Sequence, residues 1–377
     1  MGRCLAERSM LRGMQTILLN RGNTYWGCAV AGISSEPGGG GVSGGGGGTQ
    51  AVGPSASMWL WQHLDWNDKA SIRQAARFVA AIDGEVVIVD FSCDTAKQMA
   101  LFLRVLREAG ARESAAKSPS DLTVGSGVFH PRRSIVSHYV LISSDSVYQG
   151  QRLASVAEDQ PTFASMAAGA SRSDRRSYAY QKALIEAALI EGAPNGCAVT
   201  VLRLPDVIGP RDPTGRFWAT LLWARSQQPL VFPAAAAVGG QVLSIVFSED
   251  VVTWLLAVLA QGPAWAGGVY NLACSERPTL LEFTWMVADA MDGAGSATLV
   301  PCADPDADTC DYYPSVTCGP LSLAKAVAAS PAWQPTPLRD AVAASAAFFA
   351  AVDVVHAWPE YAKALRKLPA HVRAAMA

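Results

Sequence analysis

A tyrosine and a lysine four positions apart carry the clearest chemical signal in this sequence. They open the segment Tyr178-Ala-Tyr-Gln-Lys182, which begins a helix predicted to end near residue 191. A spacing of four places both side chains on one helical face, about one turn apart. A phenol titrates near pH ~10, and a neighbouring ammonium favours its anion. The pair could therefore act as a general acid/base, although the same spacing also occurs on solvated helix surfaces.

A second chemical group lies upstream, where an apolar strand predicted at residues 138–142 runs into a serine-rich segment. Ser144 follows this strand directly. Its hydroxyl could donate a hydrogen bond to the substrate oxygen that Tyr178 protonates or deprotonates. Ser144, Tyr178 and Lys182 together form a Ser-Tyr-Lys constellation.

The elements that must position these groups alternate between strands and helices. Short apolar runs predict strands at residues 16–19, 58–61, 86–89, 138–142 and 199–202, and helical spacing predicts helices at 68–81, 95–109 and 178–191. This alternation predicts an α/β fold with a doubly wound parallel sheet. In such a sheet, ligands bind at the carboxyl ends of the strands, which is where Ser144 is expected.

The chain is predicted to contain a first domain at residues 1–203 and a smaller C-terminal lobe. Glycine-rich residues 36–54 and polar residues 111–134 are expected to be inserts in the first domain. Frequent Pro and Gly divide residues 204–340 into shorter elements, which predicts a substrate-binding lobe, with parts of it returning to the first domain. Residues 341–377 are expected to form a helical extension.

Composition limits the classes of partner. A net charge of −2 offers no basic surface for nucleic acid. The longest apolar runs are shorter than the ~18–20 residues that a membrane helix needs. The eight cysteines include no C-x-x-C pair, so neither a disulfide framework nor a metal site is indicated. These features predict a cytoplasmic protein, or one in an organelle such as the plastid if the natural N-terminus carries a transit peptide.

Several ordered motifs resemble the extended short-chain dehydrogenase/reductase family, the NAD(P)-dependent epimerase/dehydratases. The matching segments are Ile142-Ser-Ser-Asp-Ser-Val-Tyr148, Tyr178-x-x-x-Lys182, Leu202-Arg-Leu-Pro-Asp-Val-Ile-Gly-Pro-Arg211, Glu249-Asp-Val251, Val269-Tyr-Asn-Leu272 and Trp333-Gln-Pro-Thr-Pro-Leu338. The likeness spans nearly the whole chain. It implies a Rossmann-like fold and hydride transfer at a carbinol carbon of a small-molecule substrate.

The resemblance also implies a role for each matching residue. Tyr178 would be the acid/base, Lys182 its partner and the holder of the nicotinamide ribose, and Ser144 the donor to the substrate oxygen. Asp145 matches a position that is also Asp in the sugar-nucleotide dehydratases, but Ser146 stands where those enzymes carry a Glu base. This difference disfavours a 4,6-dehydratase.

The cofactor side departs from the family pattern at its beginning. Gly2 resembles the last glycine of the family's phosphate-binding turn, so we expect the preceding central strand and turn to lie before this sequence. Genuine loss of both is the alternative, and it would leave the cofactor without its phosphate-binding turn. Asn20-Arg21 stands at the family position where an Arg suits the 2′-phosphate of NADP. Arg21 therefore favours NADP over NAD. A solvated turn explains this Arg equally well. The other cofactor-binding positions implied by the resemblance are Asp65, Phe91, Ser92 and Pro205.

The substrate side departs from the pattern as well. Ser146, Asp206 and Arg211 are the implied substrate-binding positions besides Ser144. Asp206 stands where sugar-nucleotide epimerases carry Asn, and Leu243 where many have an Arg that binds the diphosphate. Both differences oppose binding of two negative charges, so a substrate other than a nucleotide sugar is favoured.

Two questions stay open at the level of sequence. The alternative function is that of a non-catalytic family relative, which would act as a binding or scaffold protein and could bind RNA. A homodimer is compatible with the apolar faces at residues 95–107 and 183–189, but burial within the monomer explains them equally well.

Overall fold

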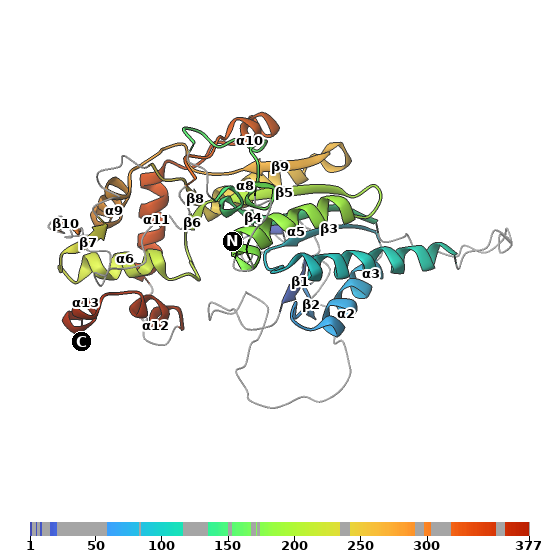
Figure 1. The fold of residues 1–377 in the computed structure, drawn as a ribbon, viewed down its shortest axis with the longest axis horizontal. Coiled ribbons are helices and arrows are strands. Elements are labelled where there is room, and N and C mark those ends of the chain that lie inside the picture. The colour runs from blue at the N-terminus through green and yellow to red at the C-terminus, as the bar shows by residue number, and fades with distance from the viewer. Residues whose placement is uncertain are drawn as a thin grey trace, which may run out of the picture.

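The computed structural model of the chain describes residues 1, 5, 8–9, 16–20, 59–82, 84–115, 135–149, 153–166, 171, 174–233, 242–290, 298–302, 318–351 and 359–376. They form a parallel sheet with helices on both faces and a smaller lobe beside it, built from the C-terminal part of the chain (Figure 1). The predicted α/β fold with a Rossmann-like parallel sheet is thereby confirmed.

The main sheet has four parallel strands in the order β3-β4-β5-β9. These are β3 (Glu85–Asp90), β4 (Ile135–Ser144), β5 (Ala198–Leu204) and β9 (Gly267–Asn271). The helices packed on or beside the sheet are α2 (Lys69–Ala80), α3 (Ala96–Ala115), α5 (Tyr178–Gly192), α8 (Ser248–Leu259) and α10 (Ala324–Ala329). Short helical turns also occur at η2 (Asp145–Tyr148), α4 (Phe163–Met166), η3 (Asp174–Arg176) and η4 (Gly262–Ala264).

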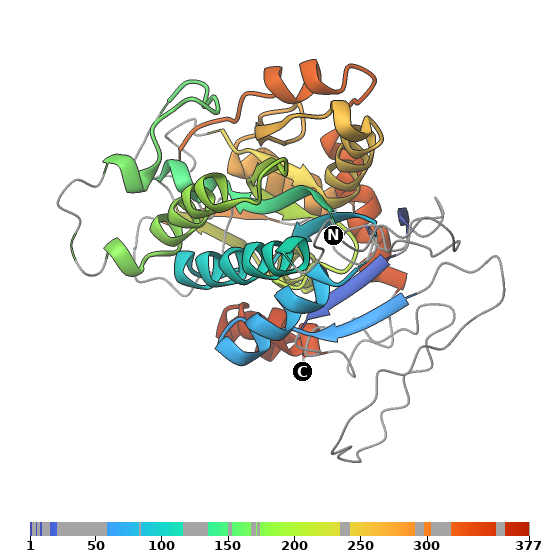
Figure 2. The ribbon, with the colours of Figure 1, turned by 90° about the vertical axis from the view of Figure 1, so that its right-hand side faces the viewer.

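Strand β4 lies inside the sheet and is buried on both faces. Tyr139 and Leu141 pack with α2, α3 and α5, whereas Val140 and Ile142 pack with α8 on the opposite face. Successive side chains of a strand point to opposite faces, so a continuous apolar run suits a strand covered from both sides. Helices α3 and α5 lie side by side over one of these faces (Figure 2).

Strands β1 (Thr16–Asn20) and β2 (Trp59–His63) form a separate parallel pair. Within the described ranges, no backbone ladder joins this pair to β3. The central strand that the sequence analysis expects before Gly2 stays a prediction.

Helix α3 is longer than the sequence analysis predicts. It continues to Ala115, five residues beyond Gly110, where glycine was expected to end it. A glycine inside a helix costs only about 1 kcal/mol relative to alanine, and the residues that follow it, Ala-Arg-Glu-Ser-Ala, include strong helix formers. The rest of the predicted polar insert, and the glycine-rich insert at 36–54, lie outside the described residues.

The C-terminal lobe has its own core. Its elements are β6 (Asp206–Ile208), α6 (Arg216–Arg225), β7 (Leu230–Pro233), β8 (Ile245–Phe247), α9 (Leu280–Asp289), β10 (Leu299–Cys302), α11 (Leu338–Ala351), α12 (Pro359–Arg366) and α13 (Ala370–Ala375). Phe349 of α11 stacks on Trp218 of α6, with ring centroids 5.1 Å apart. Residues of α11, α12 and α13 thus share the core of this lobe. The domain bounds proposed from the sequence stay predictions.

A buried ion pair joins α5 to the sheet. The Arg203 guanidinium of β5 donates to both carboxylate oxygens of Glu186 on α5, with Nη2 to Oε2 at 2.7 Å. Ser143 of β4 donates to the same carboxylate at 2.5 Å, and Arg203 also donates to the Tyr148 hydroxyl at 2.8 Å. The side chains of Arg203 and Glu186 are only 6% and 4% exposed. Helix α5 is therefore fixed to β4 and β5 by charge-assisted hydrogen bonds.

We expect Glu186→Gln to lower the free energy of unfolding by about 3 kcal/mol, because the substitution leaves the Arg203 guanidinium buried without its counter-charge. Urea denaturation followed by circular dichroism measures the change. Glu108→Gln is the matched control, since Glu108 pairs with Arg104 at 3.9 Å on the exposed surface of α3. Its expected effect is below about 0.5 kcal/mol. Equal effects of the two substitutions would contradict a structural role for the buried pair.

Candidate active site

The start of α5 fixes the positions of the predicted tyrosine and lysine. Ser177 caps the helix, because its hydroxyl accepts the backbone N–H of Tyr180 at 3.2 Å. Tyr178 is therefore the first residue of the helix, and Lys182 follows one turn later. Tyr178 is 61% exposed, whereas Lys182 is 5% exposed.

Ser144 ends β4 and meets the phenol of Tyr178. Its hydroxyl accepts the N–H of Ser146 at 3.1 Å, which turns the chain into η2 at the carboxyl end of the strand. The Ser144 hydroxyl lies close enough to the Tyr178 phenol to lower its pKa. The Nζ of Lys182 lies 5.7 Å from the centroid of the Tyr178 ring. The structure thus brings the three residues of the predicted constellation together.

The pKa of Tyr178 differs in direction from the sequence-based expectation. It is raised above the ordinary value, because the surrounding protein desolvates the phenolate and the carboxyls of Asp145 and Asp94 repel it. The Ser144 hydroxyl lowers it. The expectation that Lys182 brings this pKa toward neutrality is therefore wrong for the protein without ligands. A tyrosine in this state holds its proton at neutral pH.

Lys182 directs its ammonium toward the backbone. Its Nζ donates to the carbonyls of Cys93 and Ile142 at 3.3 and 3.4 Å. The buried carboxyl of Asp90, at the end of β3, interacts with this ammonium electrostatically. An ammonium has three donors, and these two contacts leave one for a ligand hydroxyl. Lys182 is thus placed between the ends of β3 and β4 with donor capacity to spare.

Two further carboxyls lie on the other side of Ser144. Asp145 is 5% exposed, and its Oδ1 accepts a hydrogen bond from the Ser144 hydroxyl at 3.3 Å. Burial and the nearby carboxyl of Asp206 raise the pKa of Asp145 to about 8. Asp206, at the start of β6, forms an ion pair with Arg216 of α6, with Oδ1 to Nη1 at 2.7 Å. Asp145 therefore holds a proton more readily than an ordinary carboxyl, and Asp206 is paired with a cation.

Ser146 is the third polar residue of the predicted substrate side. It is 4% exposed, and its Oγ has no hydrogen-bond partner among the described residues. A buried hydroxyl without a partner is costly and usually marks a position that water or a ligand satisfies. This observation suits the predicted role of Ser146 in substrate binding, which stays a prediction.

Two of the predicted cofactor-binding segments come together through a tryptophan. Asp65 lies in the turn after β2, where its carboxylate accepts the N–H of Asn67 at 3.0 Å. The indole N–H of the next residue, Trp66, donates to the Ser92 hydroxyl at 3.0 Å, just after β3. Phe91 packs against the core beside α8. Asp65 and Ser92 are thus held at the same edge of the fold.

The structure describes only some of the remaining predicted cofactor- and substrate-binding residues. Gly2 and Arg21 lie outside the described residues, and of Asn20 only the backbone, at the end of β1, is described. Pro205 is buried between β5 and β6. The Arg211 guanidinium lies 5.8 Å from the ring centroid of Phe348 on α11, so it faces the C-terminal lobe.

Sequence reasoning did not identify the charged partners of the site. Arg216, which forms the ion pair with Asp206, is the first residue of an otherwise largely apolar helix. A lone charged residue at the start of such a helix is the signal that could have indicated a role for Arg216. Glu186 lies four positions after Lys182 on the same face of α5, a spacing that could have indicated a third functional position. Leu243 is 1% exposed and packs in the core of the C-terminal lobe.

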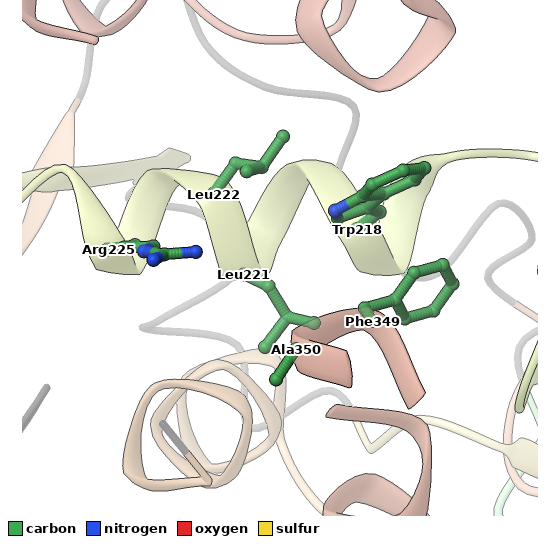
Figure 3. Close-up of a pocket in the computed structure, with 6 residues that line it drawn as sticks. All are labelled: Trp218, Leu221, Leu222, Arg225, Phe349 and Ala350. Atoms are coloured by element: carbon green, nitrogen blue, oxygen red, sulfur yellow. The ribbon is translucent and has the colours of Figure 1, made fainter. Parts of the chain in front are cut away.

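A shallow pocket on the C-terminal lobe shares no residue with this site. Its volume is about 240 Å³, including open solvent, and its lining comes from α6 and α11, as Figure 3 shows: Trp218, Leu221, Leu222, Arg225, Phe349 and Ala350. None of these side chains supplies an acid/base group suited to neutral pH.

The described residues offer neither a metal-binding cluster nor a membrane-spanning helix. No cluster of three His, Cys, Asp or Glu side chains there could hold a metal ion. Every helix in the described part of the chain is too short or too polar to cross a membrane.

Comparisons with known proteins agree with the fold. The model of the NAD dependent epimerase/dehydratase family matches residues 129–273, which include Ser144, Tyr178 and Lys182. A comparison with curated protein sequences gave no significant match.

Several solved structures share the fold at low sequence identity. MoeE5 in complex with UDP-glucuronic acid and NAD is 14% identical, with a TM-score of 0.59 over 93% of this chain and 96% of that chain. The Bordetella bronchiseptica enzyme WbmH in complex with NAD+ is 15% identical, with a TM-score of 0.58 over 93% and 94%. A UDP-galactose 4-epimerase is 17% identical, with a TM-score of 0.58 over 93% and 96%. Residues 129–273 of the chain are thus similar to the NAD dependent epimerase/dehydratase family, and the solved structures share its fold.

Proposed function

We propose that this chain is an NAD(P)-dependent oxidoreductase or epimerase that acts at one carbinol carbon of a small, sugar-derived substrate. The observation that carries the proposal is that Tyr178 lies near Ser144, at the carboxyl end of β4, and that the Nζ of Lys182 lies 5.7 Å from the centroid of the phenol ring. The family match at residues 129–273 and the NAD complexes among the structural neighbours support it.

The nicotinamide cofactor would accept or return the hydride of the carbinol carbon. The donor set on the cofactor side fits this group, because the buried ammonium of Lys182 has a donor available for a ribose hydroxyl beside Phe91 and Ser92. Asp65 is held close by through Trp66. These residues would bind and orient the cofactor, and none of them needs to move a proton.

The proton chemistry falls to Tyr178. Its phenol would exchange a proton with the substrate hydroxyl, while the Ser144 hydroxyl donates a hydrogen bond to the same oxygen. Because the pKa of Tyr178 is raised in the protein without ligands, ionisation of the phenol requires added positive charge or a proton acceptor nearby. On the substrate side, Ser146 offers a buried hydroxyl without a described partner.

The alternative of a non-catalytic binding or scaffold protein has no specific support among the described residues. A structural role does not require a phenol, a hydroxyl and a buried ammonium to meet at the carboxyl ends of parallel strands.

We expect Tyr178→Phe to lower turnover by about 10²–10⁴-fold while cofactor affinity changes little, because only the proton-transferring atom is removed. UDP-glucose, UDP-galactose and UDP-glucuronic acid serve as probes with NAD+ or NADP+, and nuclear magnetic resonance of the products reports oxidation or epimerisation. Calorimetry reports binding. Tyr180→Phe, on the same turn of α5, is the matched control. Unchanged turnover in Tyr178→Phe would exclude the catalytic role, and absence of NAD(H) and NADP(H) binding by the wild type would exclude the proposed function.

The preference for NADP rests on Arg21, which the family resemblance places near the ribose of the adenosine. We expect Arg21→Ala to weaken NADPH binding by about tenfold, because a guanidinium that pairs with phosphate contributes a charge-assisted hydrogen bond. NADH is the control ligand, since it lacks the 2′-phosphate and its affinity should stay unchanged. Equal losses for both cofactors would assign Arg21 to the structure of the turn instead.

A further inference from the structure

We propose that Asp90, the last residue of β3, is a positioning residue for Lys182, and that it acts by shaping the turn between β3 and α3. Its part in turnover rests on the proposed function, whereas the arrangement itself belongs to the protein without ligands. The chemistry proposed above gives Asp90 no role, so this one is additional.

Lys182 contacts one carbonyl from a strand and one from a turn. Its Nζ lies 3.4 Å from the carbonyl oxygen of Ile142 and 3.3 Å from that of Cys93. The backbone of Ile142 is fixed by the ladder between β4 and β5. Cys93 lies between β3 and α3, where the backbone belongs to neither a strand nor a helix. The direction of its carbonyl therefore depends on the side chains that hold the turn.

Asp90 holds this turn through both of its carboxyl oxygens. Its Oδ1 accepts the backbone N–H of Ser92 at 2.8 Å and that of Cys93 at 3.0 Å. Its Oδ2 accepts a hydrogen bond from the hydroxyl of Tyr139 on β4 at 3.0 Å. Because Tyr139 holds one oxygen, the other stays directed at the two N–H groups. The carboxyl thus fixes the peptide groups on either side of Ser92, as the side chain of Asp does in many tight turns.

The surroundings of Asp90 make an acid unfavourable unless its hydrogen bonds are needed. Asp90 is 5% exposed, and Cys93 and Tyr139 belong to the apolar core around α2 and α3. Burial of a carboxyl is unfavourable unless hydrogen bonds compensate it. The bonds of Asp90 connect the turn to β4, which is the strand that also carries Ile142. Asp90 therefore sets the two carbonyls that Lys182 contacts relative to each other.

The same turn carries residues of the predicted cofactor side. The Ser92 hydroxyl accepts the indole N–H of Trp66 at 3.0 Å, and Gln98 of α3 accepts backbone N–H groups at the end of the turn. These contacts hold the two flanks of the turn, whereas Asp90 holds the part that faces Lys182. In the proposed function the remaining donor of Lys182 binds a ribose hydroxyl. Loss of the Asp90 acceptor would therefore displace this donor.

The first test observes the Lys182 ammonium in the full chain without ligands. Lysine labelled with ¹⁵N at Nζ gives a signal for an ammonium that is held by carbonyls and shielded from water, and Lys182→Arg assigns it. We expect the signal in the wild type and its loss in Asp90→Ala. Asp90→Asn should retain it, because the amide oxygen accepts the two N–H groups and the amide nitrogen donates to Tyr139.

The second test measures cofactor binding by calorimetry with NADH and NADPH. We expect Asp90→Ala to weaken binding by about tenfold, because the Lys182 donor is no longer held in place for its charge-assisted hydrogen bond. Asp90→Asn should restore the affinity to within about twofold of the wild type, since the turn keeps its acceptor. Circular dichroism confirms folding. Should Asp90→Ala fail to fold, Asp90→Leu has the shape of the native side chain without its acceptors and carries both tests.

Asp250→Ala is the matched control for a general loss of stability. Asp250 of α8 is also buried, at 6% exposed, and its carboxyl oxygens accept the N–H and the hydroxyl of Thr336 at 2.8 and 2.7 Å. This carboxyl thus holds the segment before α11 rather than the turn beside Lys182. We expect Asp250→Ala to lower stability as Asp90→Ala does, but to leave the Lys182 signal and the cofactor affinity unchanged.

Several results would overturn the proposal. A Lys182 signal that is absent from the wild type, or that survives in Asp90→Ala, would show that Asp90 does not hold the ammonium in place. Equal losses in Asp90→Asn and Asp90→Ala would assign the effect to the charge of Asp90, and equal effects of Asp90→Ala and Asp250→Ala would assign it to stability. The signal needs no ligand. Absence of NAD(H) and NADP(H) binding by the wild type would therefore exclude the proposed function, while the signal still decides the role of Asp90.

Discussion

The attachment of α5 to the sheet by the buried Glu186–Arg203 pair is the constraint on which the site depends. Tyr178, Lys182 and Glu186 follow one another at intervals of four along the same face of α5. Glu186 is fixed to β4 and β5 by Ser143 and Arg203, so this face is held against the sheet. Lys182 is consequently buried between the ends of β3 and β4, and Tyr178, one turn nearer the helix start, emerges beside Ser144. The contacts of Glu186, two helical turns away, therefore fix the position of the Tyr178 phenol.

Sequence alone accounts for the sheet and for the meeting of Ser144, Tyr178 and Lys182. The strands predicted from apolar runs, such as 138–142 and 199–202, lie within β4 and β5, because a strand buried on both faces requires such a run. The end of α3 was placed too early, because glycine is a weaker stop signal than the helix formers that follow it here. The spacing of apolar residues thus predicts strands and helices well where burial determines which positions are apolar.

The electrostatics of the site were less predictable, because they depend on directions that spacing does not encode. The interval between Tyr178 and Lys182 places the two side chains near each other, but it does not show that the ammonium donates to the carbonyls of Cys93 and Ile142. Nor does sequence show that Asp145, a neighbour of Ser144, lies close enough to repel the phenolate. Three-dimensional packing therefore reverses the expected direction of the pKa shift of Tyr178.

The same packing changes the argument about the charge of the substrate. Asp206 taken alone would oppose an anionic ligand, and the sequence analysis counted it against a diphosphate. In the structure its carboxylate is paired with Arg216 at 2.7 Å, so the pair carries little net charge. Asp145 is protonated below a pH of about 8 and adds no charge at neutrality. The surroundings of Ser144 are therefore less negative than the sequence suggests. In the proposed substrate site, these residues would offer hydrogen bonds to hydroxyl groups rather than charge.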